Sequence, residues 1–156
     1  MTLLLQQKIK IFQKFLTEKD LKDLKKLSNT TLLQPSISGY NAKNCLLNKQ
    51  DYESNIIKRI LAKIYEIDKT LLLDKGSSTF ILFPKNSGIK KHVDCCLRFL
   101  MVISKAENGG IIKFNDEEIA LNEKDCLFFD GGTKHEVTTV ESDKGLFVLA
   151  LSFERK

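Results

Sequence analysis

The chain contains only two histidines, and each stands close to a carboxylate. One opens the triplet His92-Val93-Asp94, and the other opens His135-Glu136-Val137. Two imidazoles and one carboxylate are the set that binds Fe(II) on one face and leaves the opposite coordination positions open. This pattern indicates a non-haem iron oxygenase with His92, Asp94 and His135 as metal ligands. The alternative is that Asp94 caps a turn and that the histidines lie near acids by chance.

Spacing supports the first interpretation. His92 and Asp94 are two residues apart, so on an extended segment their side chains point to the same side. His135 begins a later apolar segment and approaches them if the two strands are neighbours. Glu136 is expected to face outward, because adjacent residues on a strand alternate.

Residues 80–153 contain further motifs in a fixed order. They are Phe83-Pro84, Gly88, Lys91-His92-Val93-Asp94, Gly109-Gly110, Leu127-Phe128-Phe129 and His135-Glu136-Val137-Thr138-Thr139-Val140. With these motifs the segment resembles the 2-oxoglutarate-dependent oxygenases, most closely the prolyl hydroxylase group. The resemblance implies a double-stranded β-helix of the jelly-roll or cupin-like kind.

The resemblance also implies the chemistry. His92, Asp94 and His135 would bind Fe(II), and the cosubstrate 2-oxoglutarate would chelate the metal and be decarboxylated to succinate and CO₂. O₂ is the second cosubstrate, and ascorbate is a further cofactor that the family allows. Lys144, nine positions after His135, would pair with the far carboxylate of 2-oxoglutarate. Lys144 also lies in a sequence typical of an exposed turn.

Arg98 is the alternative anchor for 2-oxoglutarate. It lies in the apolar segment Cys96–Val102, where an unpaired buried guanidinium would be costly. An anionic ligand would remove that cost, and related aspartyl hydroxylases carry an arginine in a similar strand. A salt bridge to an acid, or an edge position facing solvent, would explain Arg98 equally well.

The substrate expected from the resemblance is a protein or peptide side chain, most simply a prolyl residue. Two features depart from prolyl hydroxylases: Phe83 stands where they often carry a tyrosine, and the chain has no tryptophan. A nucleic acid or small molecule is the alternative substrate, slightly supported by the pI near 9.0. A non-catalytic cupin-like binding domain is a further alternative. A structural metal module is disfavoured, because it would close its coordination with a fourth side chain.

Helices are expected in the N-terminal half. Leu5, Ile9, Phe12 and Leu16 follow a helical spacing, and Thr17 to Asp20 resembles a helix start. A second helix is predicted to begin near Asn48 or Asp51. Its apolar stripe is Ile56, Ile57, Ile60, Leu61 and Ile64. Residues 29–47 look irregular.

From about Ser77 short apolar segments alternate with turn sequences, which predicts a β-sandwich or barrel. The predicted strands are Thr79–Phe83, Leu97–Ile103, Gly110–Phe114, Cys126–Phe129, His135–Val140 and Leu146–Phe153. The double glycines at 109–110 and 131–132 need no role beyond turn geometry. We therefore expect one α+β domain over residues 1–156, with residues 1–75 as mainly helical support and residues 76–156 as the β-helix core.

Bulk properties fit a globular domain. The chain has 156 residues, of which 42% are hydrophobic and 29% charged. No apolar run approaches the roughly 20 residues of a membrane helix, and the start does not resemble a signal peptide. Four cysteines without a paired framework favour reduced thiols in a cytoplasmic protein. The net charge of +5 comes from dispersed lysines, many of them on predicted helices, and the oligomeric state is left open.

Overall fold

The computed structural model describes residues 9–29, 34–35, 42–94 and 96–154. Eleven strands in this part of the chain form two sheets of seven and four strands. The large sheet has the order β1-β9-β6-β11-β4-β3-β2, and the small sheet has the order β5-β10-β7-β8. The strands are β1 (Ile9–Phe12), β2 (Gln34–Pro35), β3 (Lys43–Leu46), β4 (Leu73–Phe83), β5 (Ile89–His92), β6 (Leu97–Ser104), β7 (Ile112–Phe114), β8 (Glu117–Ile119), β9 (Cys126–Asp130), β10 (His135–Val137) and β11 (Leu146–Phe153).

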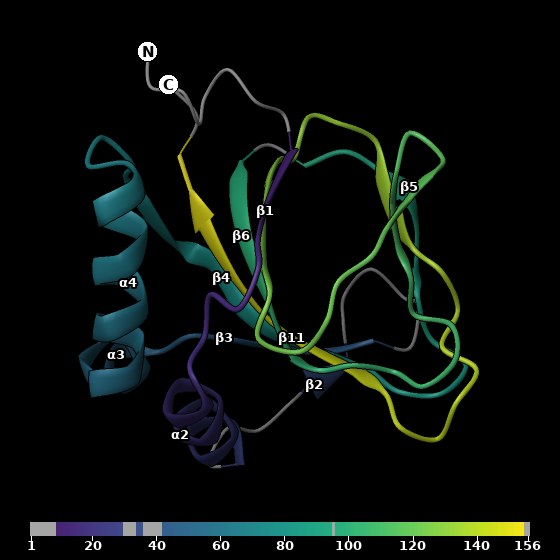
Figure 1. Ribbon diagram of the computed structural model, residues 1–156, viewed down its shortest axis with the longest axis horizontal. Coiled ribbons are helices and arrows are strands. Elements are labelled where there is room, and N and C mark those ends of the chain that lie inside the picture. The colour runs from purple at the N-terminus through teal and green to yellow at the C-terminus, as the bar shows by residue number, and fades with distance from the viewer. Residues whose placement is uncertain (1–8, 30–33, 36–41, 95, 155–156) are drawn as a thin grey trace.

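The last eight strands build the barrel by passing between the two sheets. β4, β6, β9 and β11 lie in the large sheet, and β5, β7, β8 and β10 lie in the small one. The strand pairings within both sheets are antiparallel. Figure 1 shows the two sheets facing each other, with β5 at the far edge from the helices. This topology confirms the predicted double-stranded β-helix.

In the described part of the chain, three helices lie on the outer side of the large sheet: α2 (Glu18–Asn29), α3 (Lys49–Glu53) and α4 (Asn55–Ile67) (Figure 1). The predicted start of α2 is confirmed, because the Thr17 hydroxyl accepts from the Asp20 amide and the Asp20 carboxylate accepts from the Thr17 amide. The helix predicted from Asn48 or Asp51 is divided in two. Asn48 caps α3, and the Ser54 hydroxyl caps α4.

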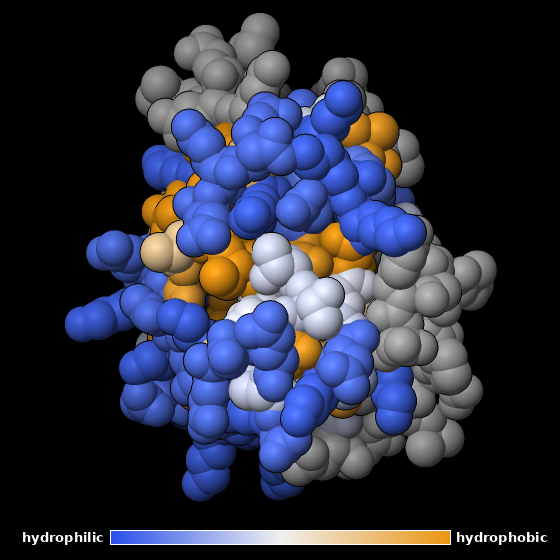
Figure 2. All heavy atoms as spheres, turned by 90° about the vertical axis from the view of Figure 1, so that its right-hand side faces the viewer, coloured by the Kyte–Doolittle hydropathy of each residue, from blue (hydrophilic) through white to orange (hydrophobic). Residues whose placement is uncertain are grey.

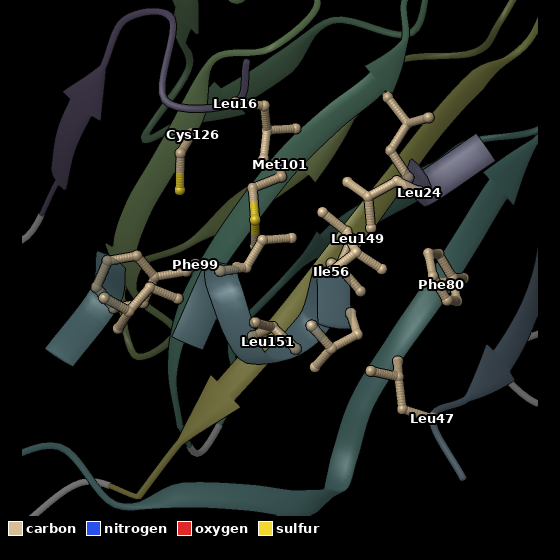
Figure 3. Close-up of a cluster of buried hydrophobic side chains, with 14 of the residues drawn as sticks. Leu16, Leu24, Leu47, Ile56, Phe80, Phe99, Met101, Cys126, Leu149 and Leu151 are labelled. Carbon is tan, nitrogen blue, oxygen red and sulfur yellow. The ribbon is translucent and has the colours of Figure 1, made fainter. Parts of the chain in front are cut away.

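The helices and the large sheet enclose the larger apolar cluster. The predicted stripe on α4 is buried there, with Ile57, Ile60 and Ile64 fully inaccessible. Figure 3 shows Ile56 close to Leu149 and Leu151 of β11, with Phe99 and Met101 of β6 beside them. Burying each such side chain contributes about 1.5–3 kcal/mol relative to leaving it exposed. This cluster therefore supports the sheet from the side away from the barrel interior.

Two predictions about the N-terminal part were wrong. Ile9–Phe12 is a strand, not a helix, and it pairs with β9. Lys43–Leu46 in the segment expected to be irregular is also a strand, paired with β4. Pairing with distant strands overrides the local helical spacing here. Leu5 of the predicted helical stripe lies outside the described residues.

The small sheet lies on the side of the molecule that faces away from the helices (Figure 1). Figure 2 shows this face, where hydrophilic side chains cover the upper and lower parts and a band of apolar and neutral atoms lies between them. Among the described residues, no helix is long and apolar enough to cross a membrane. Cys45 and Cys126 are free thiols, and Cys95 lies outside the described residues.

Candidate functional site

The two histidines meet at one end of the barrel. His92 is the last residue of β5, His135 is the first residue of β10, and the antiparallel register places them directly opposite each other. Their ring centroids are 4.3 Å apart. The condition set by the sequence, that the two strands are neighbours, is therefore met.

Asp94 completes the group from the segment between β5 and β6. Its Oδ2 lies 3.1 Å from His135 Nε2 and 3.7 Å from His92 Nε2. One donor atom from each of the three side chains lies within 4.8 Å of the other two. Three donor atoms converging on one point, with His135 buried and the other two half-buried, are suited to hold one metal ion.

Backbone carbonyls orient both imidazoles. His135 Nδ1 donates to the Thr133 carbonyl at 2.7 Å, and His92 Nδ1 donates to the Lys90 carbonyl at 2.8 Å. A carbonyl can only accept, so each Nδ1 carries a hydrogen, and Nε2 is the nitrogen of each ring that faces Asp94 and would offer its lone pair to a bound metal. Metal-binding histidines are commonly fixed in this way by their second nitrogen.

Charge favours an ionised carboxylate in this cluster. Burial raises the pKa of Asp94, but hydrogen bonds with His135 and His92 and the nearby Arg98 guanidinium outweigh it and hold that pKa well below its usual range. The hydrogen bond to Asp94 raises the pKa of His92 in turn. A divalent cation would take over the role of these positive partners.

A cavity of about 390 Å³ opens beside the three side chains. Its inner wall is mostly apolar and comes from facing residues of both sheets: Ile81, Phe83, Leu100, Ile112, Phe129, Leu146, Val148 and Ala150. Polar side chains are few there and include Asn44 of β3 and Thr79 of β4. A mostly apolar pocket with a few polar groups is typical of a site for a small ligand.

Arg98 lies on this cavity, as one of the two alternatives from the sequence requires. Its side chain is 18% exposed, and its Nε lies 3.5 Å from Asp94 Oδ2. The Nε is buried and has no hydrogen-bond partner among the described residues. A buried guanidinium nitrogen without a hydrogen bond is costly, so an anionic ligand in the cavity would complete its contacts.

Lys144 is not brought to the cluster. It does not line the cavity, and its ammonium donates to Glu123 Oε1 at 3.3 Å. The residues of β11 that do face the cavity, Leu146, Val148 and Ala150, are apolar. Lys144 lies in the exposed turn that its sequence context indicated, and of the two candidate anchors for 2-oxoglutarate only Arg98 lines the cavity.

Three residues at the cavity escaped the sequence analysis. Glu136, expected to face outward, lines the cavity together with Lys90 and Lys91. The cause is an irregular pairing: His135 lies opposite His92 and Val137 opposite Ile89, so two lysines face one glutamate. Such a bulge redirects side chains. The only signal in the sequence is the pair of lysines directly before His92.

Comparison of the fold with solved structures finds oxygenases. A prolyl-4-hydroxylase from Pseudomonas putida is 14% identical, with a TM-score of 0.73 over 98% of this chain and 95% of that one. The viral collagen prolyl hydroxylase from Paramecium bursaria Chlorella virus-1, solved with 2-oxoglutarate, is 12% identical, with a TM-score of 0.76 over 98% and 99%. The α-ketoglutarate-dependent epimerase SnoN of nogalamycin biosynthesis is 13% identical, with a TM-score of 0.69 over 94% and 78%.

These likenesses confirm the double-stranded β-helix of the 2-oxoglutarate oxygenases. Among curated proteins, none matches this sequence. The sequence model of one family, described as aspartyl/asparaginyl beta-hydroxylase, matches residues 17–156 and so covers both histidines, Asp94 and Arg98. The chain belongs to the aspartyl/asparaginyl beta-hydroxylase family.

Proposed function

We propose that this protein is an Fe(II)- and 2-oxoglutarate-dependent dioxygenase that hydroxylates a side chain of a protein or peptide. The observation that supports it most is the convergence of His92, Asp94 and His135 at the mouth of a cavity. Two imidazoles and a carboxylate leave coordination positions of an octahedral Fe(II) open for cosubstrates. Iron bound here would supply the oxidative chemistry by which 2-oxoglutarate, O₂ and a substrate C–H group give succinate, CO₂ and the hydroxylated substrate.

The protein's own residues would bind and orient. His92 and His135 would hold the metal through Nε2, because their Nδ1 hydrogens are engaged by backbone carbonyls. Arg98 would donate hydrogen bonds to a carboxylate of 2-oxoglutarate, since its guanidinium lines the cavity close to the candidate metal ligand Asp94. The apolar wall behind them would limit access of water to the reacting centre.

A prolyl side chain is the first candidate substrate. It is supported by the sequence resemblance and by the likeness of the fold to two prolyl hydroxylases. Among the described residues that line the cavity, the only Phe, Tyr or Trp side chains are those of Phe83 and Phe129.

An aspartyl or asparaginyl side chain is the second candidate. The family that contains this chain supports it. Lys91, which lines the cavity, is paired with Asp116, and Arg98 lies beside Asp94, so the charge at the cavity does not separate an acidic from a neutral substrate.

The enzyme class is tested by succinate formation. Purified protein with Fe(II), 2-oxoglutarate and O₂ should produce succinate, the His92→Ala variant should produce none above background, and Lys144→Ala should match the wild type. Peptides that differ only in a central Pro, Asp or Asn are then compared for gain of one oxygen atom by mass spectrometry, with an oligonucleotide as the comparison substrate. Wild-type protein that yields no succinate beyond an iron-only control contradicts the proposal.

A further inference from the structure

The turn between β9 and β10 contacts two of the three candidate metal ligands. It contains Asp130-Gly131-Gly132-Thr133-Lys134, and its Thr133 carbonyl already orients His135. The same turn also approaches Asp94. The Asp94 amide donates to the Gly131 carbonyl at 2.6 Å, and the Gly131 amide donates to the Cys96 carbonyl at 2.9 Å. The segment that carries Asp94 is therefore held against Gly131 by two backbone hydrogen bonds.

Because the Asp94 segment lies so close to Gly131, there is no room for a side chain at position 131. A Cβ atom there would lie 2.5 Å from the Cys96 carbonyl oxygen and 2.8 Å from the Cβ of Asp94. Non-bonded carbon atoms prefer about 3.5–4.0 Å, so the Asp94 segment would have to move away by about 1 Å. The backbone of Gly131 does not have a positive φ, so space and not conformation requires glycine here.

We propose that Gly131 is a positioning residue for the metal site: its missing side chain sets the distance between Asp94 and the two histidines. The inference rests on the proposed function, because it needs a metal to be bound. Metal ligands must lie within about 0.2 Å of their preferred distances, so a shift of about 1 Å in one ligand is large. Loss of outer contacts to metal ligands commonly weakens metal binding 10–100-fold. Gly131 thus does more than form a turn.

Two glycines of the same chain provide matched controls. Gly145 is as crowded as Gly131, since a Cβ there would lie 2.5 Å from the Phe83 carbonyl oxygen, but it contacts β4 and not the Asp94 segment. Gly132 belongs to the same turn, is exposed and has no positive φ. The first control reproduces the steric clash away from the ligands, and the second reproduces the mutation in the turn without the burial.

The test is titration of each purified protein with Co(II), read by its visible absorption spectrum and by calorimetry, with unfolding in urea measured in parallel. Gly131→Ala should bind Co(II) 10–100-fold more weakly than the wild type and give an altered spectrum. Gly145→Ala should lose stability but keep the wild-type affinity within about threefold, and Gly132→Ala should keep both. Equal affinity in Gly131→Ala and wild type, or equal weakening in Gly145→Ala, overturns the inference and leaves the proposed function standing.

Failure of the wild type to bind Co(II) overturns the proposed function, and this inference with it. If Gly131→Ala does not fold, hydrogen exchange of the wild-type Asp94 amide in the metal-free protein decides instead. That amide should be protected, because it donates to Gly131, and free exchange with solvent would overturn the inference.

Discussion

Asp20, which is buried, and Asp94, which is half-buried, both have cationic neighbours, and they differ in what those neighbours can do. Asp20, at the start of α2, accepts from Lys63 Nζ at 2.6 Å, from Arg59 at 3.2 Å and from the Thr17 amide at 3.0 Å. Its two oxygens share these donors. The partners are an ammonium, a guanidinium and an amide, none of which has a lone pair to offer a metal.

Asp94 has a different arrangement. His135, Arg98 and His92 all approach its Oδ2, at 3.1, 3.5 and 3.7 Å. Two of these partners are imidazoles with a usable lone pair, and the cluster opens on a cavity. A lowered pKa occurs at both carboxylates, whereas the identity and direction of the partners separate a structural cluster from a candidate site.

The largest expected effect comes from removing Asp94. Asp94→Ala should reduce succinate formation by at least about 10³-fold, equivalent to about 4 kcal/mol, because the metal loses a charged ligand. The free energy of unfolding of the metal-free protein should fall by about 1–3 kcal/mol, because the variant loses the contact with His135 and leaves Arg98 without its carboxylate. Succinate assays and urea unfolding on the same preparation measure both. Succinate formation that falls only as far as the folded fraction does would make Asp94 resemble Asp20.

Removing Asp20 should have the opposite result. Asp20→Ala leaves Lys63 without its carboxylate and Arg59 with Asp23 alone, each cation with about a third of its side chain exposed. It should lower the free energy of unfolding by about 2–3 kcal/mol. Succinate formation should stay within about twofold of the wild type at temperatures where the variant is folded. Lost activity in fully folded Asp20→Ala would show that the two clusters are coupled.

The pH dependence of stability should reveal the same carboxylate. Burial raises the pKa of Asp20, but hydrogen bonds from Lys63 and the Thr17 amide outweigh it and lower that pKa to about 2. In the unfolded chain the value is about 3.9, so ionised Asp20 stabilises the fold by about 2 kcal/mol above roughly pH 4. This contribution should disappear as the pH falls toward 2.

Asp20→Asn should therefore show a shallower decline of unfolding free energy between pH 4 and 2, measured by urea unfolding at each pH. Some decline should remain, because the lowered pKa of Asp94 acts in the same direction. An unchanged slope would contradict the role assigned to Asp20.

The sequence was sufficient to predict which three side chains meet as candidate metal ligands and where α2 starts, because the first signal is exclusive and the second is local. With only two histidines in the chain there is no competing pair, and the Thr17 to Asp20 spacing makes a cap whatever the tertiary fold. Six of the eight barrel strands were also predicted, since apolar segments and turn residues mark them directly. The short strands β5 and β8 were not, because most of their residues are polar.

Features that depend on distant pairing were not predictable. β1 is a strand because Ile9 and its neighbours pair with β9, which stands far along the chain. The bulge that turns Lys90 and Lys91 toward the cavity depends on the register between β5 and β10. The requirement for glycine at 131 depends on where the Asp94 segment lies. The spacing that favoured Lys144 as an anchor says nothing about the side to which a turn projects.

Arg98 and Arg59 offer the last and smallest test, because each guanidinium lies beside one of the two carboxylates. Arg59 is fully engaged with Asp20 and Asp23, whereas the Arg98 Nε has no hydrogen-bond partner among the described residues. Arg98→Leu should therefore raise the KM for 2-oxoglutarate about tenfold, equivalent to about 1.4 kcal/mol, while Co(II) affinity changes less. Lys144→Leu is the matched control and should leave this KM unchanged, because Lys144 pairs with Glu123 outside the cavity. The reverse result, with KM raised only in Lys144→Leu, would mean that Lys144 and not Arg98 binds 2-oxoglutarate. Arg98 would then be a structural partner of Asp94, as Arg59 is of Asp20.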